Sequence, residues 1–185
     1  MKPVKRHIET SSLNTYLNNE FINTFDETTK GKIAETTWKV GGNTYANIAN
    51  QPAKTAYQNE IVSPVTTNTT DGATEYSAKI GLMYVSDYGF AAVPSAWTRI
   101  LSYDSENGYN NAAVTSVNWM YMGLYEWTIS RRADSSDFAF VVIGDGNVNI
   151  NVVYGHYGVR PSFNLESAIT YVSGSGSADD PIVIN

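Results

Sequence analysis

The sequence lacks cysteine altogether in its 185 residues. Thiol nucleophiles, disulfide bonds and zinc sites built on cysteine are therefore excluded. Histidine occurs only twice, and two lone histidines do not make a zinc site. The motif at residues 145–147, Asp-Gly-Asn, is not followed by the further acidic ligands of a calcium loop. We therefore expect neither a bound metal ion nor any other cofactor.

Basic residues and long apolar runs are also scarce. Lys and Arg together number 12 against 18 Asp and Glu, which gives a formal net charge of −6. Phosphate binding needs clustered Lys and Arg, and the only basic cluster is at residues 2–7, so nucleic acid is excluded as a partner. No apolar run is long enough to span a membrane. We expect an extracellular or cell-surface location, with any export or anchor segment absent from this chain.

The residues that are abundant indicate one β-rich globular domain. A chain of 185 residues with 42% hydrophobic and 16% charged residues suits a single domain with a sizeable core. Thirteen tyrosines accompany many Asn, Thr, Ser and Gly residues. This mixture is also typical of binding surfaces, where Tyr provides rigid contact area and small polar groups adapt to the ligand. No internal repeat or linker divides the chain, so we assign one domain to residues 1–185.

Apolar spacing predicts helices near the start of the chain. Ser11 and Ser12 can cap a helix whose apolar residues recur at helical spacing: Leu13, Tyr16, Leu17, Phe21 and Phe25. Asp26 can cap a second short helix that ends near Ile33. A third short helix is expected after Asp87.

Strand-forming runs dominate the rest. Residues 43–78 and 95–117 are polar and are expected to be largely irregular. The Gly-Asp-Gly-Asn sequence at 144–147 is a strong hairpin-turn signal between two strands. A final hairpin is expected to place the last strand on the sheet. The predicted fold class is α+β, with N-terminal helices packed on a twisted antiparallel sheet with long loops. The expected strands are 36–40, 80–85, 119–131, 139–143, 148–153 and 158–165.

Residues 128–165 have an unusual composition. They contain no Lys, Glu, Gln, Trp or Met, although all five occur elsewhere in the chain. If the adenines of an Asn codon are replaced freely, the products include Asn, Ser, Asp, Gly, Ala, Val, Ile, Tyr, His, Arg and Phe, but none of the absent residues. A hairpin rich in turn residues could also lack Lys and Glu by chance. The composition therefore suggests, without establishing it, a segment diversified at adenines.

Two short motifs at the ends of this segment carry a family resemblance. The sequences YEWTISR (125–131) and GVRPSFNL (158–165) resemble elements of C-type-lectin-like domains of the formylglycine-generating-enzyme subtype. The N-terminal SSLNTYLNNEF and the later GVRP…SGSG…DPIVI are similar to bacterial surface or pilin-associated domains. The variable proteins of diversity-generating retroelements use this lectin-like fold and are diversified near the C-terminus. The resemblance covers most of the chain through short motifs.

The resemblance implies a C-type-lectin-like fold in which Trp127, Arg160 and Pro161 are structural. We expect Trp127 to fill the core and Arg160 to hold a buried or half-buried polar contact that Lys would not reproduce. The reactive cysteines of the enzyme have no counterpart, so oxidation of a substrate cysteine is excluded. The implied function is non-catalytic binding of a protein or glycan on another cell or surface.

The candidate ligand-binding residues lie in the variable region, residues 125–157. They were chosen because an Asn codon can give rise to them and because they can face solvent. Alternation along the strands must bury some of them. They are Tyr125, Arg132, Ser135, Asp137, Phe138, Val141, Ile143, Asp145, Asn147, Asn149, Ile150, Tyr154, His156 and Tyr157.

Two other functions remain open from the sequence. An enzyme would use Glu126, Asp134 or Asp137 as an acid and His156 as a base, but carboxylates close in sequence are common on solvated loops and nothing fixes their separation. A structural pilus or cell-surface subunit would share the fold and lack a diversified site. Asp179 and Asp180 are expected to be turn residues.

Overall fold

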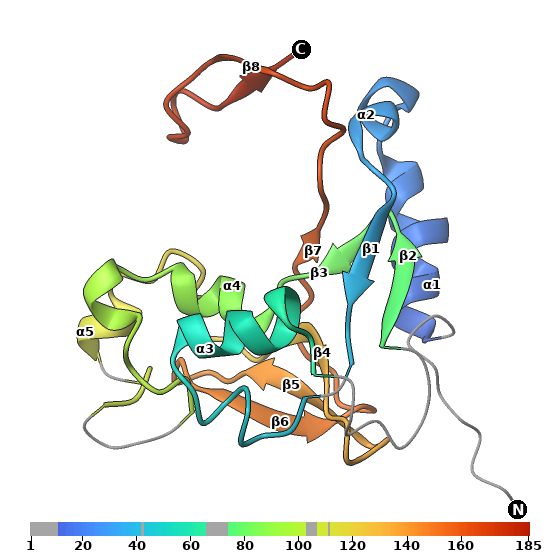
Figure 1. Ribbon diagram of the computed structural model, residues 1–185. Helices are drawn as coiled ribbons and strands as arrows, with labels where there is room; N and C mark the ends of the chain where they lie inside the picture. The colour runs from blue at the N-terminus through green and yellow to red at the C-terminus, as the bar shows by residue number, and fades with distance from the viewer. Residues whose placement is uncertain (1–10, 42, 66–73, 103–106, 111) are drawn as a thin grey trace, which may run out of the picture.

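The computed structural model describes residues 11–41, 43–65, 74–102, 107–110 and 112–185 (Figure 1). Within these ranges, helices combine with antiparallel sheets, which confirms the predicted α+β class. None of the helices described is long and apolar enough to cross a membrane. The basic cluster at residues 2–7 lies outside the described ranges.

The elements follow one another with short helices before and between the strands. The helical segments are α1 (Ser12–Asn19), the 3-10 helix η2 (Phe21–Thr24), α2 (Glu27–Lys32), α3 (Ala53–Tyr57), the π-helix η3 (Gln58–Val62), α4 (Val85–Phe90), the 3-10 helix η4 (Pro94–Ala96) and α5 (Ala112–Thr115). The strands are β1 (Thr36–Lys39), β2 (Glu75–Ala78), β3 (Gly81–Leu82), β4 (Glu126–Arg131), β5 (Phe138–Val142), β6 (Val148–Val152), β7 (Pro161–Ser162), β8 (Tyr171–Ser173) and β9 (Val183–Ile184).

Side-chain caps start the first two helices, as the sequence predicts. The Ser11 hydroxyl accepts a hydrogen bond from the Asn14 amide at 3.1 Å at the start of α1. The Asp26 carboxylate accepts one from the Thr29 amide at 2.9 Å at the start of α2. Amides in the first turn of a helix have no partner within the helix, so these short polar side chains fix where each helix begins.

The sheet of β1 and β2 packs on α1, and the Trp38 side chain hydrogen-bonds across its two strands. The two strands are antiparallel, with Trp38 opposite Tyr76, and the indole Nε1 donates to the Ala78 carbonyl at 3.0 Å. A Cβ added at Gly81 would lie only 2.7 Å from Cε2 of the indole. Glycine at this position therefore lets β3 pass directly against the Trp38 ring.

The central antiparallel sheet has the strand order β4-β5-β6. Its register places Trp127 opposite Val141, and Val141 opposite Asn149. The tight turn at 144–147 joins β5 to β6, as the Gly-Asp-Gly-Asn signal predicts. The register of β4 against β5 shifts between Trp127 and Arg131, where the pairing is irregular. The sheet continues towards the β3–β7 pair through a hydrogen bond of 2.9 Å from the Ile129 amide to the Met83 carbonyl.

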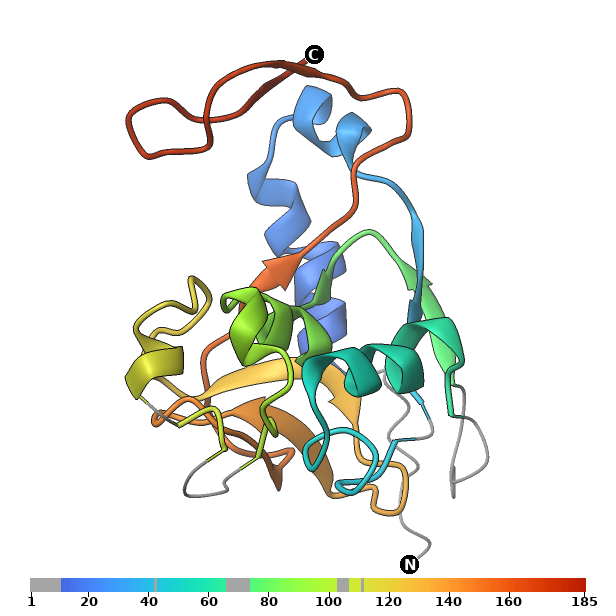
Figure 2. The ribbon, with the colours of Figure 1, turned by 60° about the vertical axis from the view of Figure 1, so that its left-hand side comes forward.

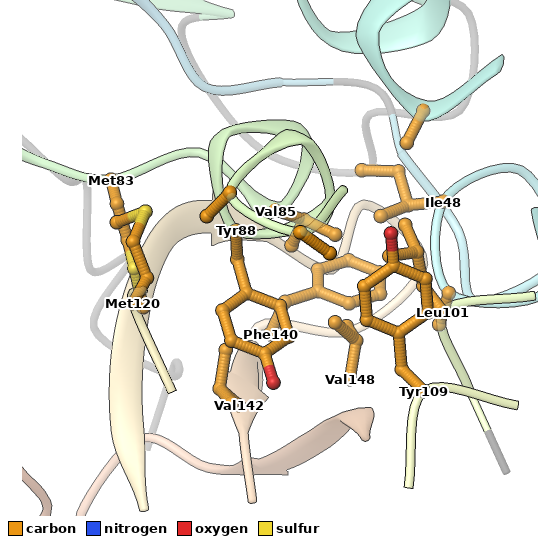
Figure 3. Packing of buried hydrophobic residues seen from close by; sticks show 14 of the residues in the cluster. Ile48, Met83, Val85, Tyr88, Leu101, Tyr109, Met120, Phe140, Val142 and Val148 are labelled. Carbon is orange, nitrogen blue, oxygen red and sulfur yellow. The ribbon is translucent and has the colours of Figure 1, made fainter. Parts of the chain in front are cut away.

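This sheet lies between two apolar clusters. Helices α3 and α4 cover one face of it, as Figures 1 and 2 show. Figure 3 shows the packing under α4, where Phe140, Val142 and Val148 of the sheet meet Val85 and Tyr88 of the helix. The second cluster joins the opposite face to the N-terminal unit, which consists of α1, η2, α2, β1 and β2. Its members are Leu17, Ile22, Ile33, Trp38, Val40, Tyr76, Ala78, Ile80, Leu82, Tyr84, Trp127, Ile129 and Val141. Trp127 therefore fills the core, as predicted.

The predicted last strand does not join the central sheet. Strands β8 and β9 instead pair with each other in a separate two-stranded sheet, and both strands are largely exposed. This C-terminal hairpin (residues 169–185) lies beyond α2, at the opposite end of the molecule from β6 (Figures 1 and 2). At its base, Lys32 Nζ donates a hydrogen bond to the Asn185 carbonyl.

Three other local predictions need correction. Residues 43–78, expected to be irregular, contain α3, η3 and β2. In the expected strand 80–85, only β3 is a strand, because the chain turns into α4 at Val85. Asp87 is the third residue of α4 and its carboxylate accepts a hydrogen bond from the Tyr84 amide at 2.8 Å, so the helix starts before Asp87.

Candidate binding surface

Arg160 and Glu126 join the two motifs that enclose the variable region. The Arg160 Nη2 lies 3.0 Å from Glu126 Oε2 and also donates to the Met120 carbonyl at 2.8 Å. The Glu126 side chain is buried and that of Arg160 is half-buried, as the sequence predicts for Arg160. A planar guanidinium can serve a carboxylate and a carbonyl at once, whereas an ammonium group fits this geometry poorly.

Main-chain hydrogen bonds strengthen the same junction. The Trp127 amide donates to the Gly158 carbonyl at 2.9 Å, and the Gly158 amide donates to the Tyr125 carbonyl at 2.7 Å. We call this junction, formed by residues 125–127 and 158–160, the frame. Residues 128–157 of the variable region leave the frame along β4 and return to it after β6, so both ends of this segment are fixed.

An aromatic row leads from the core to the surface beside the frame. The ring centroids of Trp127 and Tyr157 lie 4.9 Å apart, and those of Tyr157 and Tyr125 lie 5.2 Å apart. Trp127 is buried, Tyr157 is half-buried and Tyr125 is 43% exposed. A Cβ added at Gly155 would lie 2.7 Å from the Tyr157 ring, so the segment between β6 and the frame can pass this close to the ring only with glycine at position 155.

The loop before β4 exposes apolar side chains next to Tyr125. Tyr121 donates from its hydroxyl to the Gly144 carbonyl at 3.0 Å, so the loop lies on the β5–β6 turn. The sequence placed residues 119–125 in a core strand, and this prediction is wrong. Gly123 turns the chain with a φ of 68°, and the solvent-facing side chains include Trp119, Met122, Leu124 and Tyr125.

Arg132 organises a second polar surface at the far end of β4. Its Nε lies 2.5 Å from Asp134 Oδ1, and its guanidinium carbon lies 5.7 Å from the centroid of the Phe138 ring. The hydrogen bond from Arg132 lowers the pKa of the Asp134 carboxyl below its usual value. The Asp137 amide donates to the Ser135 hydroxyl at 3.3 Å. Four of the predicted residues, Arg132, Ser135, Asp137 and Phe138, therefore gather at this end.

Asparagine side chains line strand β6. Asn149 Oδ1 accepts a hydrogen bond from the Ile150 amide, and Asn151 Oδ1 accepts one from the Val152 amide, both at 2.8 Å. Asn151 was not among the predicted residues, although it repeats the Asn-apolar pattern of Asn149. Both asparagines are half-buried.

The predicted residues fall into three classes of exposure. Exposed are Tyr125, Asp137, Asp145, Tyr154 and His156. Half-buried are Arg132, Ser135, Phe138, Ile143, Asn149, Ile150 and Tyr157. Buried are Val141 and Asn147. The surface residues lie around the frame, around Arg132 and along β6, so they do not form a single pocket.

Val141 and Asn147 are corrected from contact residues to structural ones. Val141 is fully buried in the second apolar cluster. Asn147 accepts a hydrogen bond from the Asn110 amide at 3.0 Å through its Oδ1, and its own amide donates to Asp145 at 3.0 Å. Alternation failed for β5 because both faces of this strand meet a core. Ile143 and Ile150 also pack partly against the two clusters.

Two of the three acids considered for catalysis pair with arginines, and the third, Asp137, is exposed. Glu126 pairs with Arg160 at the start of β4, and Asp134 pairs with Arg132 beyond its end. His156 is exposed on the segment between β6 and the frame. Among the described residues, no three His, Asp or Glu side chains gather in a way that could hold a metal ion.

A buried glutamate that the sequence reasoning missed lies behind the sheet. Glu60 of η3 accepts hydrogen bonds from the amides of Val85 at 3.2 Å and Ser86 at 2.9 Å, and from the Ser130 hydroxyl. Burial raises the pKa of Glu60 to about 7, against a usual value of 4.5. Glu60 thus ties η3 to the start of α4 and to β4. Its sequence signal was faint, because a glutamate in the mixed polar and apolar segment QNEIV gives no sign of being buried.

Comparison with known proteins gives a family. The chain matched no curated protein. It also matched no solved structure. Residues 5–167 match a domain family, so the match includes the frame and the variable region and stops before the C-terminal hairpin. The chain therefore belongs to the family described as Domain of unknown function (DUF6273).

Proposed function

We propose that this chain is a C-type-lectin-like domain that binds a ligand, without catalysis, through a surface diversified by a retroelement. The ligand is a protein or glycan on another cell or surface, and the protein acts outside the cell or at its surface. Two observations support the proposal. The composition of residues 128–165 is the one expected if adenines in Asn codons are replaced, and the structure fixes this segment at the frame.

The observation that carries the proposal is the frame. The Arg160–Glu126 ion pair and two main-chain hydrogen bonds close the variable segment at its base. None of these contacts depends on an exposed side chain between residues 132 and 157. Side chains on the surface of a rigid scaffold can therefore change at little cost in stability, as a diversified binding site requires.

The exposed members of the site have the chemistry of binding surfaces. Tyr125 and Tyr154 offer aromatic contact area, and Tyr154 is 74% exposed. Asp137, Asp145 and His156 add polar groups that can select a partner. The nearby Met122 and Leu124 extend the apolar area beside Tyr125.

The coding DNA tests this proposal directly. Diversification requires a nearby near-copy of the region that encodes residues 125–157, differing from it at adenines of the template. We expect such differences to concentrate at codons for exposed residues and to spare codon 141. A genome without the near-copy, or with differences spread evenly over all bases, would overturn the diversification proposal.

A structural pilus or cell-surface subunit is the second candidate. The C-terminal hairpin favours it, because strands β8 and β9 expose apolar side chains, including Tyr171, Val172 and Val183. A two-stranded hairpin is marginally stable alone in water, so one that exposes apolar residues is suited to a contact with another chain.

A further inference from the structure

Strand β6 is the open edge of the central sheet. The Val148 amide donates to the Leu101 carbonyl at 2.7 Å, on the side away from β5. Because main-chain groups alternate along an antiparallel strand, the amides of Ile150 and Val152 also point away from β5. Among the described residues, the partners of these two amides are the side chains of Asn149 and Asn151. None of the described strands pairs with this side of β6.

The asparagines cover the edge with weak local contacts. A side chain that binds the amide of the next residue can swing away, which frees a main-chain donor for a new partner. Exposed edges are usually protected by Lys, Pro or a covering segment. Residues 146–155 contain neither Lys nor Pro and no charged residue. The two asparagines are therefore the protection given to Ile150 and Val152.

The C-terminal hairpin has strands that resemble β6 in carrying no charge, so one of them can pair with the β6 edge of another copy. Residues 169–173 and 181–185, which contain β8 and β9, have no charged side chain. Tyr171 is 64% exposed and Val172 is 57% exposed, and the family match ends at residue 167, before the hairpin begins. The chain has a net charge of −6, so uncharged strands are the parts that two copies can bring together without repulsion.

We propose that the C-terminal hairpin of one copy adds β8 to the β6 edge of a second copy, displacing the side chains of Asn149 and Asn151. The hairpin and β6 lie at opposite ends of the molecule (Figures 1 and 2), so each copy donates at one end and accepts at the other. Such a head-to-tail contact does not close on itself and gives open chains of copies. The inference does not rest on the diversified binding site and can hold if that site binds nothing.

The test compares four variants of the full chain by sedimentation over a range of concentrations. Val152→Pro removes the outward amide at the acceptor, since proline has no N–H, and leaves the inward ladder bonds in place. Val172→Lys places a charge on the donor strand. Their matched controls, Val152→Thr and Val172→Thr, keep the amide and add no charge. We expect wild type and both controls to associate with concentration in steps of the 20.3 kDa monomer, and the two blocked variants to remain monomeric.

Mixing the two blocked variants separates this contact from a symmetric one. Val152→Pro retains a donor and Val172→Lys retains an acceptor, so an equimolar mixture should form dimers and nothing larger. Circular dichroism of each variant shows that it is folded. Wild type that stays monomeric at millimolar concentration, or a mixture that gives no dimers, would overturn the proposal.

A variant with stronger association gives an independent check that does not depend on proline. Asn149→Ala with Asn151→Ala removes the competing acceptors while keeping both amides. We expect association on the order of tenfold tighter than wild type, with slower hydrogen exchange of the Ile150 and Val152 amides in the associated state. Unchanged association would show that the asparagines are merely local contacts and would contradict the displacement step.

Discussion

At the scale of single residues, Glu60 makes stability depend on pH. Its pKa is raised by burial to about 7, so the folded protein takes up a proton more readily than the unfolded chain. The stabilisation that comes from protonating Glu60 is fully present below pH 4.5 and is lost as pH rises through about 7. The expected loss is about 3 kcal/mol in the free energy of unfolding. Urea unfolding at pH 5 and pH 8 measures it.

Glu60→Gln provides the decisive comparison. Glutamine can accept from the Ser86 amide and donate to the Ser130 hydroxyl, but its NH2 group cannot accept from the Val85 amide, so the variant should be less stable than wild type at pH 5. Glutamine also has no charge that titrates between pH 5 and pH 8. The variant should therefore lose most of the difference between pH 5 and pH 8, while the exposed control Glu166→Gln should keep it. Equal pH dependence in wild type and Glu60→Gln would show that other groups control the effect.

Arg160 carries a second prediction at the same scale. Arg160→Lys loses the geometry that serves Glu126 and the Met120 carbonyl together, and leaves a buried carboxylate poorly satisfied. We expect a loss of about 1–3 kcal/mol in the free energy of unfolding, measured by urea denaturation. The control is Arg132→Lys: Arg132 is half-buried like Arg160, but its partner Asp134 is exposed whereas Glu126 is buried, so the change should alter stability by less than about 1 kcal/mol. Similar losses in both variants would contradict the structural role of Arg160.

At the scale of elements, local signals predicted the structure where the deciding contacts are local. The caps of α1 and α2 and the turn at 144–147 are each set by a few neighbouring residues, and the structure confirms them. The loop 119–125 was wrongly predicted because its aromatic residues suggested a core strand, whereas the chain turns at Gly123 and leaves Trp119 and Tyr125 exposed. Glu60 was missed because its partners are far away in the sequence.

The candidate site was harder to predict than the strands that carry it. The sequence predicts strands β5 and β6 nearly to the residue, yet it does not reveal that Val141 and Asn147 are buried. Alternation indicates which residues share a face, but not whether a face meets solvent. Here the second apolar cluster, brought from the N-terminal unit, covers the face that carries Val141. Only the arrangement of layers reveals that burial.

This difference between positions predicts which substitutions residues 125–157 tolerate. Tyr154→Asn replaces an exposed side chain and should change the free energy of unfolding by less than about 0.5 kcal/mol. Val141→Asn places an amide in the second apolar cluster and should cost about 3 kcal/mol or more. Thermal melting of both variants measures the contrast. A tolerated Val141→Asn would contradict the assignment of Val141 to the core.

At the scale of the whole molecule, the central sheet couples the two clusters. Phe140 and Val141 are neighbours in β5, yet they face the first and the second cluster respectively. Loss of packing on one side must therefore disturb the strand that supports the other. The molecule is expected to unfold as one cooperative unit rather than as two halves, one on each side of the central sheet.

Two substitutions on opposite sides of the sheet test this coupling. Ile48→Ala opens a cavity in the first cluster and Leu17→Ala opens one in the second, each at an expected cost of about 2–4 kcal/mol. With Trp97 and Trp119 replaced by Phe, the remaining Trp38 and Trp127, both in the second cluster, report its unfolding by fluorescence, while circular dichroism reports the whole chain. Because the sheet belongs to both clusters, Ile48→Ala should shift both signals to the same lower urea midpoint. A fluorescence midpoint that stays at the wild-type value in Ile48→Ala would mean that the two clusters unfold independently.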